Sequence, residues 1–338
     1  MLKIYLLYTG GTIGMLPKDR SDPKSPLAPV KWDIIEHYFT FPDGVDITFA
    51  EMPNIIDSSD VTPAYWADIA RRIGDNYDNH DGFVILHGTD TLAYTASALS
   101  FMFENLAKPV ILTGSQRTVT TRNTDAITNL ANAISVAAEC PQIHEVCVFF
   151  QKKLLRGNRT RKYSTFRVDG FKSYNYPRLV DIKTQVPYIR PTKFYKTSTS
   201  TEPFTIHDTF DTNVIILDIF PGIDCAFLKH IFDTNGLNGI VLRTYGAGNA
   251  PTTPEFLGTV EYAVRDKGIV VVNLTQCLEG RVEVGKYETG VALTELGVLN
   301  GAKLTPEAAV TKMMYLFGLR LGVDEVKVKM TENLRGEM

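Results

Sequence analysis

Six short apolar runs constrain the fold of this chain more than any other feature. Each run is rich in β-branched residues, ends in a glycine or polar turn, and is followed by a helical pattern. The runs are KIYLLYTGG, GFVILHGTD and KPVILTGSQ in the first half, and NVIILDIFPG, GIVLRTYGAG and GIVVVNLTQ after a gap. Continuous apolar strands that alternate with amphipathic segments are typical of parallel sheets covered by helices on both faces. The sequence therefore predicts an α/β fold.

The segment after HGTD illustrates the helical pattern. Apolar side chains and one threonine recur there at helical spacing, at Leu92, Thr95, Leu99, Met102 and Leu106. This spacing predicts a helix with one face on a sheet.

The length of 338 residues is too great for one modest core, so we expect two domains of unequal size. Residues 191–213 are polar, rich in threonine and serine, and without a strong period. We interpret them as a linker between a larger domain, residues 1–190, and a smaller one, residues 214–338.

Composition excludes several classes of protein. Apolar residues make up 44% and charged residues 22% of the chain, as in ordinary globular proteins, and the net charge of −3 predicts no nucleic-acid or anionic-membrane partner. No apolar segment approaches the roughly 20 residues that span a bilayer. The opening MLKIYLLYTGG lacks a small-residue cleavage site, so we interpret it as a first strand. The four cysteines are scattered without a metal-binding spacing, which favours reduced thiols and a cytoplasmic protein.

Three predicted strands end in unusual polar residues. The ends are Thr9–Gly10–Gly11–Thr12, Gly88–Thr89–Asp90 and Thr113–Gly114–Ser115. Ligands bind beyond the carboxyl ends of parallel strands, and small residues there let a ligand approach backbone N–H groups. Thr12 and Thr89 also offer hydroxyls, and a threonine is a nucleophile once a base takes its proton.

A nucleotide-binding turn is the first alternative for the glycines near the N-terminus. The first glycine of a GxGxxG motif would fall on Thr9, and no strand ending in an acid follows about 20 residues later. The chain also lacks a GK[ST] motif, which excludes a P-loop.

Helix capping is the alternative for two other motifs. Asp90 has the position of an N-cap for a helix that begins near Thr91. In DSSDVTP, Thr62 has the position of an N-cap and Pro63 that of a first helical residue. Capping leaves Ser58 and Ser59 unexplained, and they are either turn residues or hydrogen-bond donors.

The motif RGNRTRK, residues 156–162, packs four charges into seven positions. A run of this kind is usually a solvated face, and that is our interpretation of Arg156, Arg159 and Arg161. Lys162 has a different role from these arginines only if folding brings it beside Thr89 and Asp90, where a partly buried lysine can act as a base.

His87 is the other candidate base, because histidine most often has this role. It stands inside the apolar run VILHGT, and we interpret it as a buried structural histidine. No group of His, Asp or Glu has metal-ligand spacing, so we expect no metal.

Together these motifs resemble the bacterial type I, cytoplasmic L-asparaginases. The resemblance rests on TGGTIG, DSSD, HGTDT and RGNRTRK, and continues through YTASALSFM, GNAP, VVNLTQC and ENLRGE. It covers nearly the whole chain, and TGGTI followed by HGTDT is highly specific.

The resemblance implies a two-domain fold with a flavodoxin-like, parallel-sheet N-terminal domain and a smaller α/β C-terminal domain. It implies hydrolysis of L-asparagine to L-aspartate and ammonia without a metal or cofactor, and a homotetramer built as a dimer of dimers. Thr12 would be the nucleophile, and Thr89, Asp90 and Lys162 would carry the proton.

Substrate contacts are implied in the same way. Asp90 would pair with the α-ammonium group, while Ser58 and Ser59 would hold the α-carboxylate and α-amino end. Backbone amides around Gly11, Thr12 and Gly114 would stabilise the oxyanion.

Two departures from the family matter. The family has a tyrosine in the lid after TGGTIG, but residues 15–31 contain none and the next tyrosine is Tyr38. Some members bind asparagine at an allosteric site. Arg243 and Cys277 match that site, whereas Arg161 stands where a threonine is usual, which puts cooperativity in doubt.

Three alternative functions stay open. The same chemistry could act on glutamine or on an asparaginyl group in a larger molecule, since one methylene changes binding by only about 1–3 kcal/mol. A catalytically weak asparagine sensor and a nucleotide-binding module belong to other classes.

Overall fold

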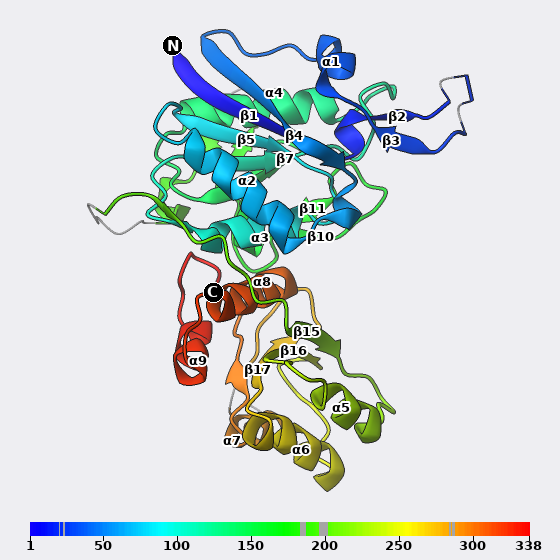
Figure 1. Ribbon diagram of the computed structural model, residues 1–338, viewed down its shortest axis with the longest axis vertical. Helices are drawn as coiled ribbons and strands as arrows, with labels where there is room; N and C mark the ends of the chain where they lie inside the picture. The colour runs from blue at the N-terminus through cyan, green and yellow to red at the C-terminus, as the bar shows by residue number, and fades with distance from the viewer. Residues whose placement is uncertain (20, 23, 183–186, 196–201, 284, 286–287) are drawn as a thin grey trace. The chain divides into compact units, whose positions relative to one another are not determined.

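The computed structural model describes residues 1–19, 21–22, 24–182, 187–195, 202–283, 285 and 288–338 (Figure 1). Its contacts divide the chain into two compact units, Met1–Asp208 and Thr209–Met338. The boundary falls within the predicted linker, of which residues 196–201 lie outside the described residues. All six predicted strands are present.

The N-terminal unit is built on an eight-stranded sheet of order β13-β12-β9-β8-β7-β5-β1-β4. Its strands are β1 (Leu2–Gly10), β4 (Val45–Ile56), β5 (Gly82–Leu86), β7 (Val110–Thr113), β8 (Val146–Phe150), β9 (Lys153–Arg156), β12 (Val180–Ile182) and β13 (Pro187–Ile189). Strands β4, β1, β5, β7 and β8 are parallel, in the order 2-1-3-4-5 of the flavodoxin-like fold. The expected fold class is confirmed.

Part of this sheet was not predicted. Strands β9, β12 and β13 extend it by antiparallel pairing, and each has only three or four residues. Strand β4 lies at the opposite edge, and most of its residues are partly or fully exposed. Short strands and a solvated edge strand lack the continuous apolar pattern on which the prediction rests.

Helices cover both faces of the sheet (Figure 1). On one face α4 (Ala126–Glu139) packs its apolar side chains against Ile4, Leu6, Val84 and Ile111. On the other face lie α2 (Pro63–Asp75) and α3 (Leu92–Met102), which contact each other. The loops at the carboxyl ends of the strands therefore emerge from a sheet that helices cover on both faces.

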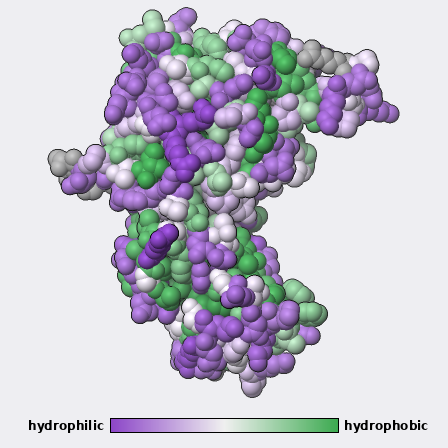
Figure 2. Space-filling model, in the orientation of Figure 1, coloured by the Kyte–Doolittle hydropathy of each residue, from purple (hydrophilic) through white to green (hydrophobic). Residues whose placement is uncertain are grey.

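Helix α2 begins as predicted. The Thr62 hydroxyl accepts the N–H of Tyr65, and Pro63 is the first helical residue, so both capping assignments are confirmed. Its outward side carries exposed charges such as Asp68 and Arg71, and the face of this unit seen in Figure 2 is largely hydrophilic.

Helix α3 differs from the prediction of one apolar face. All of its residues except Tyr94 are buried, and it ends at Met102, so that the buried Leu106 lies beyond it. The hydroxyls of Ser97 and Ser100 donate to the carbonyls four residues earlier, which satisfies these polar groups inside the unit.

Short pairs of strands and one small helix complete the N-terminal unit. They are β2 (Met15–Pro17) with β3 (Leu27–Pro29), β6 (Phe103–Glu104) with β14 (Thr205–Ile206), β10 (Arg161–Lys162) with β11 (Phe171–Lys172), and α1 (Trp32–Ile35).

The C-terminal unit has a parallel sheet of order β15-β16-β17-β18. Its elements are β15 (Val214–Asp218), α5 (Cys225–Phe232), β16 (Gly239–Thr244), α6 (Pro254–Glu261), β17 (Val270–Thr275), α7 (Glu288–Glu295), β18 (Leu299–Asn300), α8 (Pro306–Gly318) and α9 (Val323–Thr331). One apolar cluster joins α5 and α6 to the sheet, while α8 and α9 contact the strands separately.

A buried ion pair closes the end of the chain onto α8. Lys312 Nζ lies 2.6 Å from Glu337 Oε1, and both side chains are fully buried. Burial lowers the pKa of Lys312, and Glu337 also accepts the N–H groups of Leu334 and Arg335. These bonds fold the last residues into the C-terminal unit. In the described part of the chain, no helix is long and apolar enough to cross a membrane.

Candidate active site

The candidate site lies where the strand order reverses in the large sheet. Strands β1 and β5 are neighbours, but the chain continues from β1 to β4 on one side and from β5 to β7 on the other. Such a switch point is where ligands bind in open α/β sheets, because the two following loops diverge and leave a crevice. Thr12 follows β1, and Thr89 follows β5.

Glycines bring the loops at this point into direct contact. Gly11 has φ +85°, and a Cβ added to it would lie 2.2 Å from Gly88 Cα. A Cβ on Gly88 would lie 2.6 Å from Ser58 Oγ, and one on Gly114 would lie 2.3 Å from the carbonyl oxygen of His87. Side chains at these positions would force the loops apart. The loops after β1, β4, β5 and β7 therefore meet at one place.

Thr12 opens a 3₁₀ turn, Thr12–Gly14, directly beyond Gly11. The turn is closed by the Gly14 N–H donating to the Gly11 carbonyl at 2.9 Å, and by the Met15 N–H donating to the Thr12 carbonyl. Thr12 is partly exposed, and no described residue forms a hydrogen bond with its hydroxyl. This hydroxyl is therefore open to a ligand.

Lys162 lies beside both residues that the sequence analysis named as its possible partners. Its Nζ is 2.8 Å from Thr89 Oγ1 and 2.5 Å from Asp90 Oδ1. The Lys162 side chain is 16% exposed and that of Asp90 63% exposed, so the lysine is largely sheltered from solvent while the aspartate faces it. Thr89 itself is buried.

Asp90 does not cap helix α3. The helix begins at Leu92, its N-cap position is Thr91, and no side chain caps it. Instead, the Thr91 hydroxyl donates to the Ser58 carbonyl at 2.6 Å, and the Asp90 N–H donates to Ser58 Oγ at 3.2 Å. The capping alternative for Asp90 is therefore wrong.

Ser58 and Ser59 have different surroundings. Ser58 is buried against Gly88 and Asp90. Ser59 is exposed, and both its N–H and its hydroxyl donate to Asp57 Oδ1 at 2.9 Å. Only Ser58 is thus in contact with the loop that carries Thr89.

Gln116 belongs to this group but was not predicted. Its Oε1 lies 3.4 Å from Thr89 Oγ1, and its Nε2 donates to the carbonyls of Ser164 and Arg167 at 3.0 and 3.2 Å. These two bonds orient the amide, so its oxygen faces the Thr89 hydroxyl. The sequence feature that could have indicated Gln116 is its position two residues after Gly114, at the end of a predicted strand.

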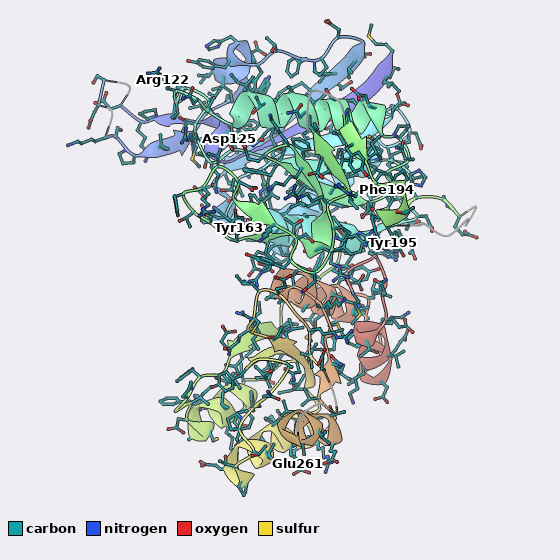
Figure 3. All side chains as sticks on the ribbon, turned by 180° about the vertical axis from the view of Figure 1, so that it is seen from behind. Arg122, Asp125, Tyr163, Phe194, Tyr195 and Glu261 are labelled. Carbon is teal, nitrogen blue, oxygen red and sulfur yellow. The ribbon has the colours of Figure 1, made fainter. Side chains whose placement is uncertain are left out.

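A buried carboxylate holds the loop that carries Gln116. Asp125, directly before α4 (Figure 3), accepts the N–H groups of Gln116 and Arg117 at 2.9 and 3.0 Å. Burial raises the pKa of Asp125, although these N–H donors lower it in part. Asn129 joins Asp125 to the Gly114 carbonyl through its Nδ2. The loop after β7 is therefore tied to the helix.

His87 lies behind the site as a neutral structural histidine, as predicted. It is 1% exposed, and burial lowers its pKa to about 4. Its Nδ1 donates to the Gly88 carbonyl at 2.7 Å, so its Nε2 accepts the Thr95 hydroxyl at 2.9 Å. Thr95 in turn accepts the indole N–H of Trp66. Both ring nitrogens are occupied, which excludes His87 as the base for Thr12.

The interpretation of Arg156 and Arg159 as a solvated face is wrong. They are only 4% and 3% exposed. Arg156 Nε lies 2.6 Å from Glu145 Oε2, and its guanidinium stacks 4.2 Å from the centre of the Tyr176 ring. Arg161 is partly exposed on β10. The motif folds inward because its 3₁₀ turn, Gly157–Arg159, packs on α3.

The segment after the 3₁₀ turn of Thr12 forms a β-hairpin. Strands β2 and β3 pair in antiparallel register, and residues 20 and 23 of the connecting turn lie outside the described residues. The buried phenol of Tyr8 donates to the Val30 carbonyl at 2.9 Å and lies 3.2 Å from that of Gly14. These contacts connect Tyr8 of β1 to the residues directly before β2 and directly after β3, at the base of the hairpin.

Arg243 and Cys277 lie close together in the C-terminal unit. Arg243 on β16 binds Asp218 through Nη1 at 2.9–3.0 Å, and its Nη2 donates to the Gln276 carbonyl at 3.4 Å. The Nε of Arg243 is buried without a hydrogen bond to any described residue. Cys277 is exposed next to Gln276. No group of three potential metal ligands occurs in the described ranges.

The fold and the site define a two-domain α/β enzyme in which a lysine contacts a threonine hydroxyl and an aspartate at a strand switch point. The chain belongs to the asparaginase family. The family description "Asparaginase, N-terminal" matches residues 3–194, and "Glutaminase/Asparaginase C-terminal domain" matches residues 213–330. The family is one of amidohydrolases.

Known proteins match the chain along nearly its whole length. L-asparaginase 1 of Escherichia coli K12 is 42% identical over 340 residues, covering 99% of this chain and 97% of that protein. The crystal structure of L-asparaginase I from Vibrio cholerae has a TM-score of 0.89 and 41% identity, covering 100% of this chain and 99% of the other. The thermostable L-asparaginase from Thermococcus kodakarensis has the same TM-score at 33% identity and the same coverage.

His87 makes stability depend on pH. Its pKa is about 4 in the folded chain and about 6.5 when unfolded, so between these values the unfolded chain binds the extra proton. The free energy of unfolding should therefore fall as pH falls, by about 2 kcal/mol between pH 7 and pH 5 from this group. Urea unfolding at several pH values measures how the free energy of unfolding changes with pH. His87→Gln should make this change smaller, whereas the exposed control His37→Gln should leave it as it is.

NMR titration of the His87 imidazole tests the same point without a variant. The ring should stay neutral down to pH 5, and titration near pH 6.5 would contradict the prediction.

Proposed function

We propose that the protein is an L-asparaginase that hydrolyses L-asparagine to L-aspartate and ammonia through a threonine nucleophile. One observation carries this mechanism: Lys162 Nζ contacts Thr89 and Asp90 in the loop after β5, next to the loop after β1 that carries the open Thr12 hydroxyl. The family membership supports the activity.

Thr12 Oγ attacks the side-chain amide carbon of the substrate. Thr89 takes the proton of the Thr12 hydroxyl and passes its own to Lys162, which accepts it as a neutral amine and then gives a proton to the leaving nitrogen, which departs as ammonia. The resulting ester between Thr12 and the aspartyl group is opened by water, which returns a proton to Thr12 and releases L-aspartate. Backbone N–H groups at Gly11, Thr12 and Gly114 stabilise the oxyanion of each step.

Substrate recognition uses both charged ends of the amino acid. The exposed Asp90 carboxylate binds the α-ammonium group, and Ser58 and Ser59 bind the α-carboxylate and α-amino end. Holding both ends places the amide carbon next to Thr12. The substrate then loses its freedom of motion on binding rather than during the reaction, which lowers the activation free energy of the attack. The contact between Ser58 and the Asp90 N–H supports this arrangement, because it links the two binding groups.

Mixed glutaminase–asparaginase activity is the second candidate, because the C-terminal family description includes both activities. The asparagine sensor is less well supported, since the contacts of Lys162 with Thr89 and Asp90 suit proton transfer, which binding alone does not need.

Further proposals concern assembly, location and regulation. We propose a cytoplasmic homotetramer, supported by four free cysteines and by exposed apolar side chains such as Phe220 and Phe227 on the C-terminal unit. Arg243 and Cys277 remain candidate effector residues, supported by the unpaired, buried Arg243 Nε.

Steady-state kinetics on L-asparagine and L-glutamine test the function. Ammonia release should be far faster with L-asparagine at low concentration, and a sensor would bind asparagine without turnover. A sigmoidal concentration dependence would support an effector site, whereas a hyperbola would argue against one.

Replacement of the nucleophile tests the role of Thr12. Thr12→Ala should reduce kcat by several orders of magnitude, because nothing else in the described site offers an open hydroxyl at this turn. Thr12→Ser keeps the hydroxyl and should retain much more activity. Circular dichroism and size-exclusion chromatography control for folding. Near-normal turnover by the alanine variant would remove Thr12 from the mechanism.

Gln116 should act as a positioning residue for Thr89. Gln116→Met keeps the approximate shape of the side chain but removes its hydrogen bonds. It should lower kcat about fivefold with little change in KM, since a hydrogen bond contributes about 1 kcal/mol. The exposed Gln142→Met is the matched control and should leave both constants unchanged. An increase in KM alone would instead indicate a substrate-binding role.

A further inference from the structure

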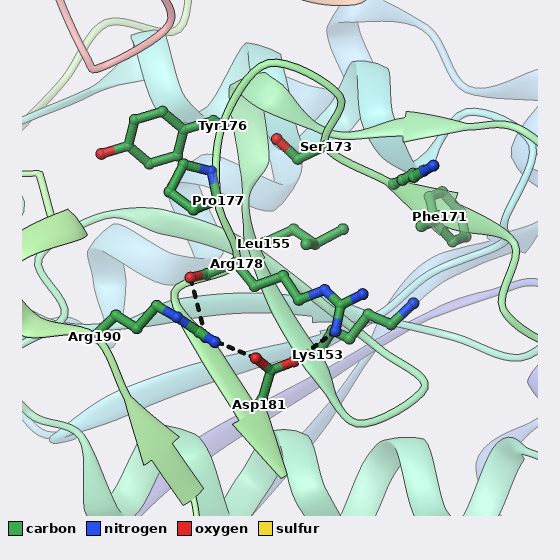
Figure 4. A pocket seen from close by; sticks show the side chains of 10 residues that line it. Lys153, Leu155, Phe171, Ser173, Tyr176, Pro177, Arg178, Asp181 and Arg190 are labelled. Atoms are coloured by element: carbon green, nitrogen blue, oxygen red, sulfur yellow. Dashed lines mark hydrogen bonds and ion pairs between the residues drawn. The ribbon is translucent and has the colours of Figure 1, made fainter. Parts of the chain in front are cut away.

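A pocket in the N-terminal unit is lined by none of the residues described around Thr12. It has a volume of about 320 Å³, near the lower end of the range for small-molecule sites. Strand β9, the segment from Phe171 to Arg178, Asp181 of β12 and Arg190 form its walls (Figure 4). None of the residues assigned above to hydrolysis lines it, so it needs a separate explanation.

Cationic side chains dominate this pocket. Lys153, Lys172, Arg178 and Arg190 line it, and Asp181 is the one carboxylate among its described lining residues. Lys153 also pairs with Asp169 outside the lining. The four cationic side chains and the two carboxylates, Asp181 and Asp169, together leave two positive charges in excess at the pocket. The whole chain, by contrast, has a net charge of −3.

Asp181 aligns the two arginines rather than neutralising all of their donors. Arg178 Nη1 lies 2.9 Å from Asp181 Oδ1, and Arg190 Nη1 lies 2.7 Å from Asp181 Oδ2 (Figure 4). Burial by itself raises the pKa of Asp181, but the hydrogen bonds and charges of both arginines outweigh it and hold the pKa below its usual value. The carboxylate thus stays ionised and fixes both guanidinium groups at one wall.

Each guanidinium keeps donors for a ligand. The hydrogen bonds of Arg178 and Arg190 to other described residues use Nη1 in both cases, which leaves Nε and Nη2 available. The Ser173 hydroxyl, also in the lining, is buried and has no hydrogen-bond partner among the described residues. A buried hydroxyl without a partner is costly, and an anionic ligand oxygen would satisfy it.

Apolar side chains form the rest of the wall. Leu155, Phe171 and Pro177 lie next to the cationic groups (Figure 4). A ligand that fits both regions has a compact anionic group attached to an apolar or aromatic body.

We propose that this pocket binds the phosphate group of a small phosphate monoester, independently of the hydrolytic site. Arginine forks bind phosphate oxygens in pairs, which matches the fixed pair Arg178 and Arg190. A phosphate monoester carries about −1.5 to −2 charges at pH 7, which matches the excess of two positive charges. The proposal goes beyond amide hydrolysis and does not rest on it.

Isothermal titration calorimetry at constant ionic strength tests the proposal with phenyl phosphate, inorganic phosphate and succinate as probes. Phenyl phosphate should bind most tightly, because it also reaches the apolar wall, and inorganic phosphate should bind more weakly at the same stoichiometry. Tighter binding of succinate would overturn the assignment to phosphate, and absence of saturable phosphate binding would overturn the site.

Variants locate the binding. Arg178→Gln should weaken phenyl phosphate binding at least tenfold, while the exposed control Arg122→Gln, outside the pocket, should not change it. Asparagine hydrolysis by Arg178→Gln should remain normal, which shows that the variant is folded and separates this test from that of the proposed function. If Arg178→Gln does not fold, Lys172→Gln should show a several-fold loss. Unchanged affinity in the folded variants contradicts the proposal.

Discussion

The close backbone contact between Gly11 and Gly88 is the constraint on which the candidate active site depends. Strands β1 and β5 are paired in the sheet, but their loops can touch only where no Cβ stands between them. Each glycine is followed at once by a threonine, so this contact brings together the loops that carry Thr12 and Thr89. Ser58 packs against Gly88, so the loop after β4 joins the other two at this place.

Hydrogen bonds then fix the polar groups that these loops present. Asp125 holds the backbone of Gln116, whose side chain reaches Thr89, and Lys162 reaches Thr89 from the β10–β11 hairpin. Such bonds are strong where water is largely excluded, because the local dielectric is low. The same hairpin carries Phe171, opposite Lys162, into the wall of the cationic pocket. One small structural element therefore borders both sites.

Much of the fold could be predicted because it follows local patterns. The six apolar runs became strands, Thr62 and Pro63 start α2, and the apolar surroundings of His87 indicated its burial. Strand β4, the short strands β9, β12 and β13, and the burial of nearly all of α3 were not predicted. Their stability comes from pairing and packing with distant segments, which no pattern within a short window records. The burial of Arg156 was not predicted for the same reason. Its partner Glu145 becomes a neighbour only through the pairing of β8 and β9.

The sequence by itself determined the α/β class, the positions of the glycine turns and the places of Thr12, Thr89 and Asp90 at predicted strand ends, because strand patterns and turn residues are local properties. Only the tertiary structure decided that Lys162, 73 positions from Thr89, lies 2.8 Å from its hydroxyl. It alone also placed Gln116 opposite Thr89 and gathered four cations into one pocket. Distances between side chains on different loops depend on how the strands are ordered in the sheet, and that order is set by packing of the whole unit.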